Sequence, residues 1–191
     1  REKDHPFFLY LAYDAPHDPY HIDDTSWYDD KGKWSDKTKR YAALVTHMDY
    51  NIGRVLGAID ALGLRKNTLI IFASDNGAAV MAPVKTLNCG GGLKGHKGQL
   101  YEGGIKVPLI VNQPGMVPVQ RLKDIVCFAD FMPTLAAITG STKALPHDID
   151  GMDISPLFYG KKVDTDHRYI YWEFPGKQRA IRSADWKAES I

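Results

Sequence analysis

The pattern of apolar and polar positions changes along the first third of the chain, and each change predicts a different structure. Residues 7–13 are continuously apolar or aromatic, which is typical of a strand buried on both faces, as in a parallel sheet. Residues 14–39 have no period, which predicts a long surface loop of a kind that is often functional. Residues 41–62 repeat apolar side chains at three- and four-residue steps, which predicts a helix ended by Gly63 as a left-handed cap.

Shorter apolar runs follow this helix and predict strands at residues 68–74, 107–111 and 125–129. A second helix is expected at residues 131–139, with Asp130 as its N-cap and Gly140 after its last residue. The alternation of strands and helices up to residue 140 favours the α/β class, a layered sheet with flanking helices.

The last thirty residues have a different pattern. Residues 169–174 and 179–182, separated by the turn Pro175-Gly176, predict an antiparallel hairpin, and Trp186 opens another strand. We therefore expect an incomplete α/β domain over residues 1–160 and the start of a small antiparallel subdomain over residues 161–191.

Composition and charge narrow the possible partners. The 191 residues are 44% hydrophobic and 25% charged, which is the average of globular proteins. The net charge of +1 gives no field for nucleic acid or an anionic membrane, so an anion must be held by a local site. No apolar run approaches the ~18 residues that a membrane span needs. Two cysteines, Cys89 and Cys127, are too few for a disulfide framework.

Polar groups that can carry chemistry follow two of the predicted strands. Asp75 and Asn76 come directly after residues 68–74, and their carboxylate and amide oxygens suit a hard cation such as Ca²⁺ or Mg²⁺. The same Asp-Asn-Gly composition is common in plain turns, and both interpretations stay open. His17 follows the first predicted strand between Pro16 and Pro19, where it is either a functional imidazole or merely an exposed one.

A third candidate is the segment 89–104, which has seven glycines in sixteen residues and includes Lys94 and Lys97. Glycines let the backbone approach a ligand closely, and the lysines supply positive charge. The segment therefore indicates an anion site or, equally, a mobile glycine-rich loop.

These pieces together resemble one family, the type I (arylsulfatase-like) sulfatases of the alkaline-phosphatase-like superfamily. The resemblance covers nearly the whole chain and depends on the order and spacing of its motifs. They are Ala15-Pro16-His17, the helix around Met48-Asp49-Tyr50-Asn51-Ile52-Gly53, the run from Thr68 to Gly77, the run from Lys94 to Pro108, Asp130 to Leu135, Asp150-Gly151-Met152-Asp153 and Asp185-Trp186-Lys187.

The resemblance implies a site. In such sulfatases the residues matching Asp75 and Asn76 bind a divalent cation, usually calcium, and the lysine matching Lys97 contacts the sulfate. The histidine matching His17 also reaches the sulfate ester, so His17 and Lys97 are the expected catalytic and substrate-binding residues. The chemistry agrees, because a metal, a lysine and an imidazolium stabilise charge that spreads over sulfate oxygens. His17 could also protonate the leaving oxygen.

Two expected parts of the family pattern do not occur in this sequence. The family nucleophile is a formylglycine made from a Cys- or Ser-x-Pro-x-Arg motif, and neither Cys89 nor Cys127 begins one. The paired aspartates that complete the metal site are also missing. We therefore expect the central-to-C-terminal part of a longer enzyme, inactive by itself, rather than a gene truncated in evolution.

The resulting hypothesis is a sulfuric ester hydrolase that acts on a sulfated small molecule or carbohydrate. The alternatives are a phosphate or phosphonate ester hydrolase of the same superfamily and a non-catalytic sulfatase-like module. Trp27, Tyr28 and Trp34 either line a substrate cleft and stack on a sugar ring or are ordinary surface aromatics. Family habit suggests an extracytoplasmic location: periplasmic, secreted or lysosomal.

Overall fold

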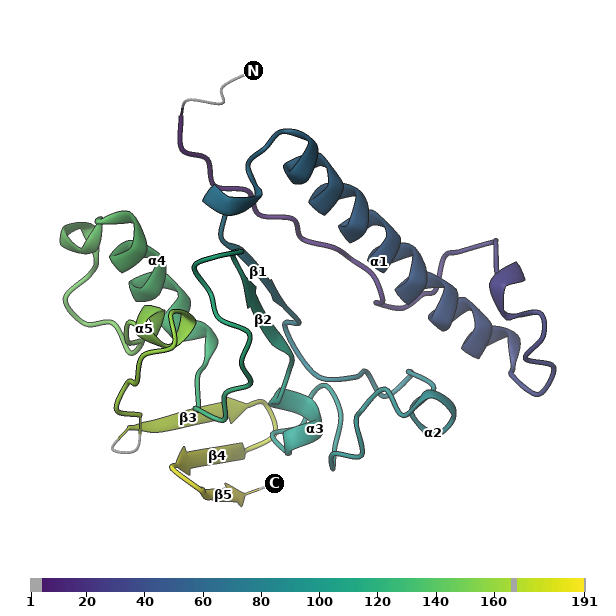
Figure 1. Ribbon diagram of the computed structural model, residues 1–191. Coiled ribbons are helices and arrows are strands. Elements are labelled where there is room, and N and C mark those ends of the chain that lie inside the picture. Colours follow the sequence, from purple (N-terminus) through teal and green to yellow (C-terminus); the bar gives the residue numbers. More distant parts are fainter. Residues whose placement is uncertain (1–4, 166–167, 191) are drawn as a thin grey trace. The chain divides into compact units, whose positions relative to one another are not determined.

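The structure is a computed structural model that describes residues 5–165 and 168–190 (Figure 1). The chain divides into two compact units, which are described separately: Arg1–Ala58 with Met81–Cys89, and Ile59–Val80 with Gly90–Ile191. Residues 166–167 and 191, which belong to the expected C-terminal subdomain, lie outside the described residues.

A long helix dominates the first unit. Helix α1 (Asp36–Ala61) begins five residues before the apolar repeat, because Ser35 Oγ accepts a hydrogen bond from the Thr38 N–H at 3.2 Å and caps the helix there. It ends as predicted at Gly63, which has φ +71° and donates its N–H to the Asp60 carbonyl at 2.9 Å. The 3₁₀ turn Ser26–Tyr28 and the short helix α2 (Val84–Leu87) also belong to this unit.

The predicted strand at residues 7–13 is wrong. This segment is not a strand in the structure, and its side chains are exposed; Phe8 and Tyr10 are each 79% exposed. An apolar run supplies the propensity for a strand, but a strand also needs a neighbour for its backbone hydrogen bonds. The ladders that the described residues form do not include residues 7–13.

The second unit contains a two-stranded sheet. Strands β1 (Ile70–Ala73) and β2 (Leu109–Asn112) confirm two predicted strands, with Ile70 opposite Asn112. They run antiparallel, whereas alternating strands and helices are typical of parallel pairs. The connection between them holds two four-residue helices, α2 and α3 (Glu102–Ile105), and not the long crossover helix that is usual between parallel neighbours.

Helix α4 (Phe131–Thr139) has the predicted bounds, and Gly140 ends it with φ +71°. The short helix α5 (Ser155–Phe158) supplies part of the core of this unit, and α4 packs against that core through Ile138. The core residues are Ile154, Leu157 and Phe158, packed against Leu69 and Ile71 of the β1 region and Val111 of β2.

The carboxylate of Asp130 departs from its predicted role. Asp130 occupies the N-cap position of α4, as predicted, but its side chain makes no capping bond; its carboxylate instead accepts hydrogen bonds from the N–H groups of Cys127 at 2.8 Å and Met152 at 3.0 Å. The bond to Cys127 folds Phe128–Asp130 into a 3₁₀ turn, so residues 125–129 do not form the predicted strand.

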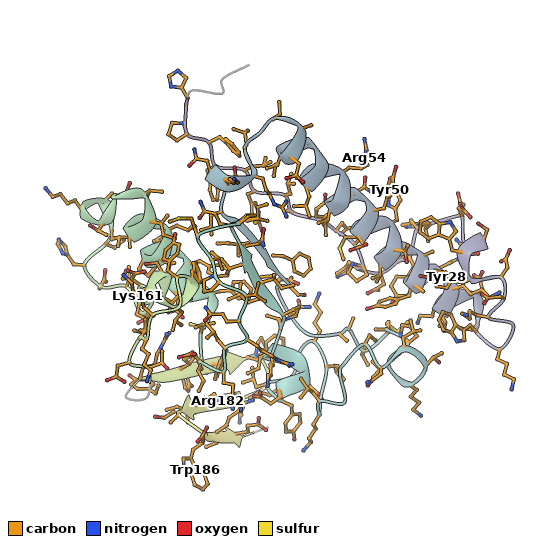
Figure 2. The ribbon with its side chains drawn as sticks, in the orientation of Figure 1. Tyr28, Tyr50, Arg54, Lys161, Arg182 and Trp186 are labelled. Atoms are coloured by element: carbon orange, nitrogen blue, oxygen red, sulfur yellow. The ribbon has the colours of Figure 1, made fainter. Side chains whose placement is uncertain are left out.

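The predicted C-terminal hairpin and the strand after it are confirmed. Strands β3 (Tyr169–Phe174), β4 (Gln178–Ser183) and β5 (Trp186–Ser190) form an antiparallel sheet in that order. Figure 1 shows this sheet beside α3. Figure 2 shows Trp186, which is 84% exposed, pointing away from the sheet.

Candidate active site around the end of strand β1

The residues that follow β1 form a tight turn, which we call the strand-end loop (residues 74–78). Ser74 Oγ donates to the Asn76 carbonyl at 2.9 Å, and Asn76 Nδ2 donates to the Gly77 carbonyl at 3.0 Å. Asp75 is exposed and Asn76 is half-buried. As predicted, Asp75 and Asn76 therefore lie just beyond the carboxyl end of a strand, on a backbone that its own side chains stabilise.

The glycine-rich loop (residues 90–104) packs directly on the strand-end loop. The Lys97 N–H donates to the Ala78 carbonyl at 2.8 Å, and the Gly77 N–H donates to the Gly104 carbonyl at 2.9 Å. A Cβ atom at position 77 would lie 1.8 Å from the Gly103 carbonyl oxygen, so only glycine permits this approach. The structure thus brings the backbone of Lys97 next to the loop that carries Asp75 and Asn76.

Charged side chains surround the end of the glycine-rich loop. Lys94 Nζ lies 3.8 Å from the centre of the Tyr101 ring, a cation–π contact. The Glu102 carboxylate is 26% exposed and accepts hydrogen bonds from Arg182 and Lys187. Burial by itself raises the pKa of Glu102, but the hydrogen bonds and charges of Lys187 and Arg182 together lower it by more than burial raises it. The pKa of Glu102 is therefore below its usual range. Glu102 is therefore ionised at neutral pH.

His17 belongs to the first unit. Its N–H donates to the Asp14 carbonyl at 2.8 Å, and its ring Nδ1 lies 2.5 Å from the Asp18 carbonyl oxygen and 4.0 Å from a carboxylate oxygen of the same residue. Its side chain is 52% exposed. The local contacts fix the backbone and leave part of the imidazole accessible; its convergence with Lys97 on one ligand stays a prediction.

Asp75 and Asn76 have the right chemistry for a divalent cation, but they are only two ligands. Among residues 5–165 and 168–190, three or more His, Cys, Asp or Glu side chains do not gather into a potential metal site. Asp75 and Asn76 offer a carboxylate and an amide oxygen, which are ligand types that a hard divalent cation prefers. Ca²⁺ takes about six to eight oxygens, so these two side chains fit such a cation but would be a minority of its ligands.

The aromatic residues of the 14–39 segment contact each other. The rings of Tyr28 and Trp34 stack at 5.6 Å, whereas Trp27 is 63% exposed. Tyr28 and Trp34 line a pocket of about 320 Å³ in the first unit, together with Tyr41 and Cys89. Burial, with Cys89 nearby, raises the pKa of Tyr41 to about 12, so this wall of the pocket stays neutral at physiological pH.

The sequence did not indicate that residues of the C-terminal sheet hold the glycine-rich loop through Glu102. Glu102 and Lys187 lie within motifs that carry the family resemblance, but no local pattern indicates that they pair. Arg182 is 80 residues from Glu102 in sequence and alternates with apolar residues like any strand residue. The one available signal is the pair Gly103-Gly104 beside Glu102, because adjacent glycines indicate close backbone packing.

Comparison with known proteins shows which proteins this chain is similar to. Residues 1–141 match the Sulfatase family model, and residues 95–189 match the model of the N-sulphoglucosamine sulphohydrolase C-terminal region. Human arylsulfatase A is 32% identical over 193 residues, which cover 98% of this chain and 36% of that protein. The chain spans about a third of the length of such curated relatives.

Solved structures add the fold. The crystal structure of Ps i-CgsB in complex with k-i-k-neocarrahexaose superposes with a TM-score of 0.86 and 32% identity, covering 100% of this chain and 42% of that one. The phosphonate monoester hydrolase SpPMH from Silicibacter pomeroyi shares the fold alone, with a TM-score of 0.62 and 20% identity over 81% of this chain and 32% of its own.

The chain belongs to the sulfatase family and has its α/β, alkaline-phosphatase-like fold, as the resemblance implied. That family implies a bound metal and a formylglycine. Among the described residues, no helix is both long and apolar enough to cross a membrane.

Proposed function

We propose that this chain supplies part of the active site of a sulfuric ester hydrolase. In this proposal Lys97 contacts the sulfate group, Asp75 and Asn76 bind a divalent cation, and His17 acts near the leaving oxygen. The observation that carries the proposal is the hydrogen bond from the Lys97 N–H to Ala78, which anchors the lysine beside the loop of Asp75 and Asn76. The division into a catalytic part over residues 1–160 and a C-terminal subdomain is part of the same proposal.

The chain's own residues supply charge and a proton. Lysine at the sulfate stabilises the charge that develops on the oxygens as the ester bond breaks, and an imidazolium can protonate the departing alkoxide. A cation, with calcium as the proposed ion, supplies Lewis-acid stabilisation of the same oxygens when it is bound. The formylglycine nucleophile would come from outside residues 1–191, so these residues alone should not hydrolyse a sulfate ester.

The proposed substrate is a sulfated carbohydrate, with a sulfated small molecule as the second possibility. The similarity to Ps i-CgsB, crystallised with k-i-k-neocarrahexaose, supports a carbohydrate. The exposed Trp27 offers an aromatic face of the kind that can stack on a sugar ring. An extracytoplasmic location belongs to the same proposal.

A phosphonate or phosphate ester hydrolase is the second candidate, favoured by the fold shared with SpPMH. A non-catalytic module is the third, favoured by the missing nucleophile motif. The full-length gene product should be assayed in parallel with an aryl sulfate, an aryl phosphate and an aryl phosphonate. Turnover of the sulfate alone supports the proposal, a preference for phosphorus esters supports the second candidate, and no turnover supports the third.

Substitution of Lys97 tests the residue assignment. In the full-length gene product, Lys97→Ala should lower kcat/KM for the sulfate ester by about 100-fold or more, because it removes a cation from developing charge. The matched control is Lys106→Ala, since Lys106 is an exposed lysine shortly after the same loop. Equal activity of Lys97→Ala and Lys106→Ala would contradict the assignment.

A further inference from the structure

Three polar side chains of the C-terminal sheet reach alternating positions of the glycine-rich loop directly after Lys97. Two bind backbone carbonyls and the third binds a carboxylate. The contacts are Gln178 Nε2 to the Gly98 carbonyl at 3.2 Å, Lys187 Nζ to the Leu100 carbonyl at 2.6 Å, and an Arg182 guanidinium N–H to both Glu102 carboxylate oxygens at 3.1 Å. Residues 98, 100 and 102 are thus held at every second position.

The ionic part of this contact is partly shielded from water. Lys187 is 10% exposed, and its Nζ lies 3.0 Å from Glu102 Oε1 as well as 2.7 Å from Glu189 Oε1. Arg182 is 26% exposed, as is Glu102, and Arg182 is labelled in Figure 2. Hydrogen bonds between ionised groups are about twice as strong as neutral ones, so this cluster restrains the loop more than ordinary polar contacts would.

The same loop is also restrained at Lys97 itself. The Lys97 N–H is bonded to the Ala78 carbonyl, in the loop that follows β1, whereas Gly98 (φ +87°) has the Phe174 ring of the C-terminal sheet 3.9 Å from its Cβ position. A segment with this many glycines has a large conformational entropy, so Lys97 would sample many positions without such restraints. The anchors fix the backbone at Lys97 between β1 and the C-terminal sheet.

We propose that Glu102, Arg182 and Lys187 are positioning residues that hold Lys97 in place for the sulfate group. This inference rests on the proposed function. Electrostatic stabilisation of a transition state requires a charge that is already in place, and a displacement of about 1 Å can cost about 100-fold in rate. In this proposal the C-terminal sheet acts on the chemistry through Lys97.

A double-mutant cycle on the full-length gene product tests this inference. Arg182→Ala should lower kcat/KM for an aryl sulfate by about tenfold or more, and Arg182→Lys, which keeps a cation, should restore part of the loss. In the Lys97→Ala background, Arg182→Ala should cause no further loss, because the group that it positions is gone. If Arg182→Ala does not fold, Glu102→Gln, which keeps the shape of the side chain, replaces it in the cycle.

The matched control is Arg179→Ala on the same strand. Arg179 pairs with Glu173 at 3.5 Å on the surface, and both side chains are more than half exposed. The substitution Arg179→Ala should therefore leave kcat/KM unchanged. An equal loss from Arg182→Ala in both backgrounds would indicate a general structural effect and overturn the inference. No loss from Arg182→Ala, while Lys97→Ala is impaired, would overturn it and leave the proposed function standing.

Hydrogen exchange keeps the two proposals separable if no sulfate ester is hydrolysed. In Arg182→Ala the Lys97 amide should exchange at least tenfold faster than in the wild type, whereas Arg179→Ala should not change it. Unchanged exchange at Lys97 would overturn the positioning role without reference to activity. Faster exchange in an inactive protein would support the anchoring and reject only the proposed function.

Discussion

Two carboxylates of the second unit bind an arginine, and their surroundings differ. Asp130 is completely buried; Arg168, which is 16% exposed, donates to both of its oxygens at 2.8 and 2.9 Å. Glu102 and Arg182 are each 26% exposed and are joined by longer contacts of 3.1 Å. One pair is dry and the other is in partial contact with water.

These surroundings indicate what each pair does. Asp130 also accepts the N–H groups of Cys127 and Met152, so it ties three chain segments into the core. A buried ion that loses its partner is costly, and such a network therefore governs stability. Glu102 is attached to a glycine-rich loop at the surface, where an ion pair contributes little to stability and can still fix the position of a neighbour.

Loss of the buried carboxylate should have the largest effect. Asp130→Ala should lower the free energy of unfolding by about 3–5 kcal/mol, because it leaves the Arg168 charge and two N–H groups without their acceptor. Urea unfolding of the full-length gene product measures this change. Replacement of the exposed Asp148 by Ala is the control and should change stability by no more than about 0.5 kcal/mol. Similar values for both variants would remove the distinction between the buried pair and the surface pair.

A backbone contact beside Glu102 should have an intermediate effect. A Cβ atom at Gly104 would lie 2.0 Å from the Gln99 carbonyl oxygen and 2.6 Å from that of His96, so Gly104→Ala should destabilise the protein by about 1–3 kcal/mol. Gly53 lies in α1 with nothing within 4 Å of its Cβ position, so Gly53→Ala should stabilise by about 0.5–1 kcal/mol. Thermal unfolding distinguishes the two signs, and a stabilised Gly104→Ala would show that the loop is not tightly packed.

The smallest expected effect is the pH dependence of the Glu102 pair. The pKa of Glu102 is lowered below its ordinary 4.5 in the folded state, so its contribution to stability is present above pH 4.5 and is lost as pH falls through the folded value. The cations that face Glu102 are Arg182 and Lys187. The difference in unfolding free energy between the wild type and Glu102→Gln should be within about 1 kcal/mol at pH 7 and should vanish at acid pH. A difference that grows on acidification would contradict this sign.

The sequence predicted the elements whose signals are local. The apolar repeat and Gly63 defined the body and the end of α1, and the turn Pro175-Gly176 located the C-terminal hairpin. The start of α1 was missed because the Ser35 cap lies outside the repeat. The strand predicted at residues 7–13 was wrong because an apolar composition indicates a need for burial but does not show which neighbouring strand would provide it.

The candidate site divides in the same way. The Asp75-Asn76 turn and the lysines of the glycine-rich loop carry short motifs, so the amino-acid sequence alone singles them out. The partner of Asp130 at Arg168 and the partner of Glu102 at Arg182 are separated from them by 38 and 80 residues. Such pairings depend on how the chain folds back, and a single sequence holds no local record of that path.

The alternating anchors are synthesised later than the loop that they hold. The side chains that hold positions 98, 100 and 102 come 80–87 residues later in the chain than the loop they hold. At about 5–20 residues per second, the ribosome would expose the lysine-bearing loop roughly 4–17 s before its partners arrive. During that interval a nascent chain would already carry Lys97 but would lack the residues that hold it in position. If the positioning role holds, Lys97 would thus reach its working position only after strands β4 and β5 have been synthesised.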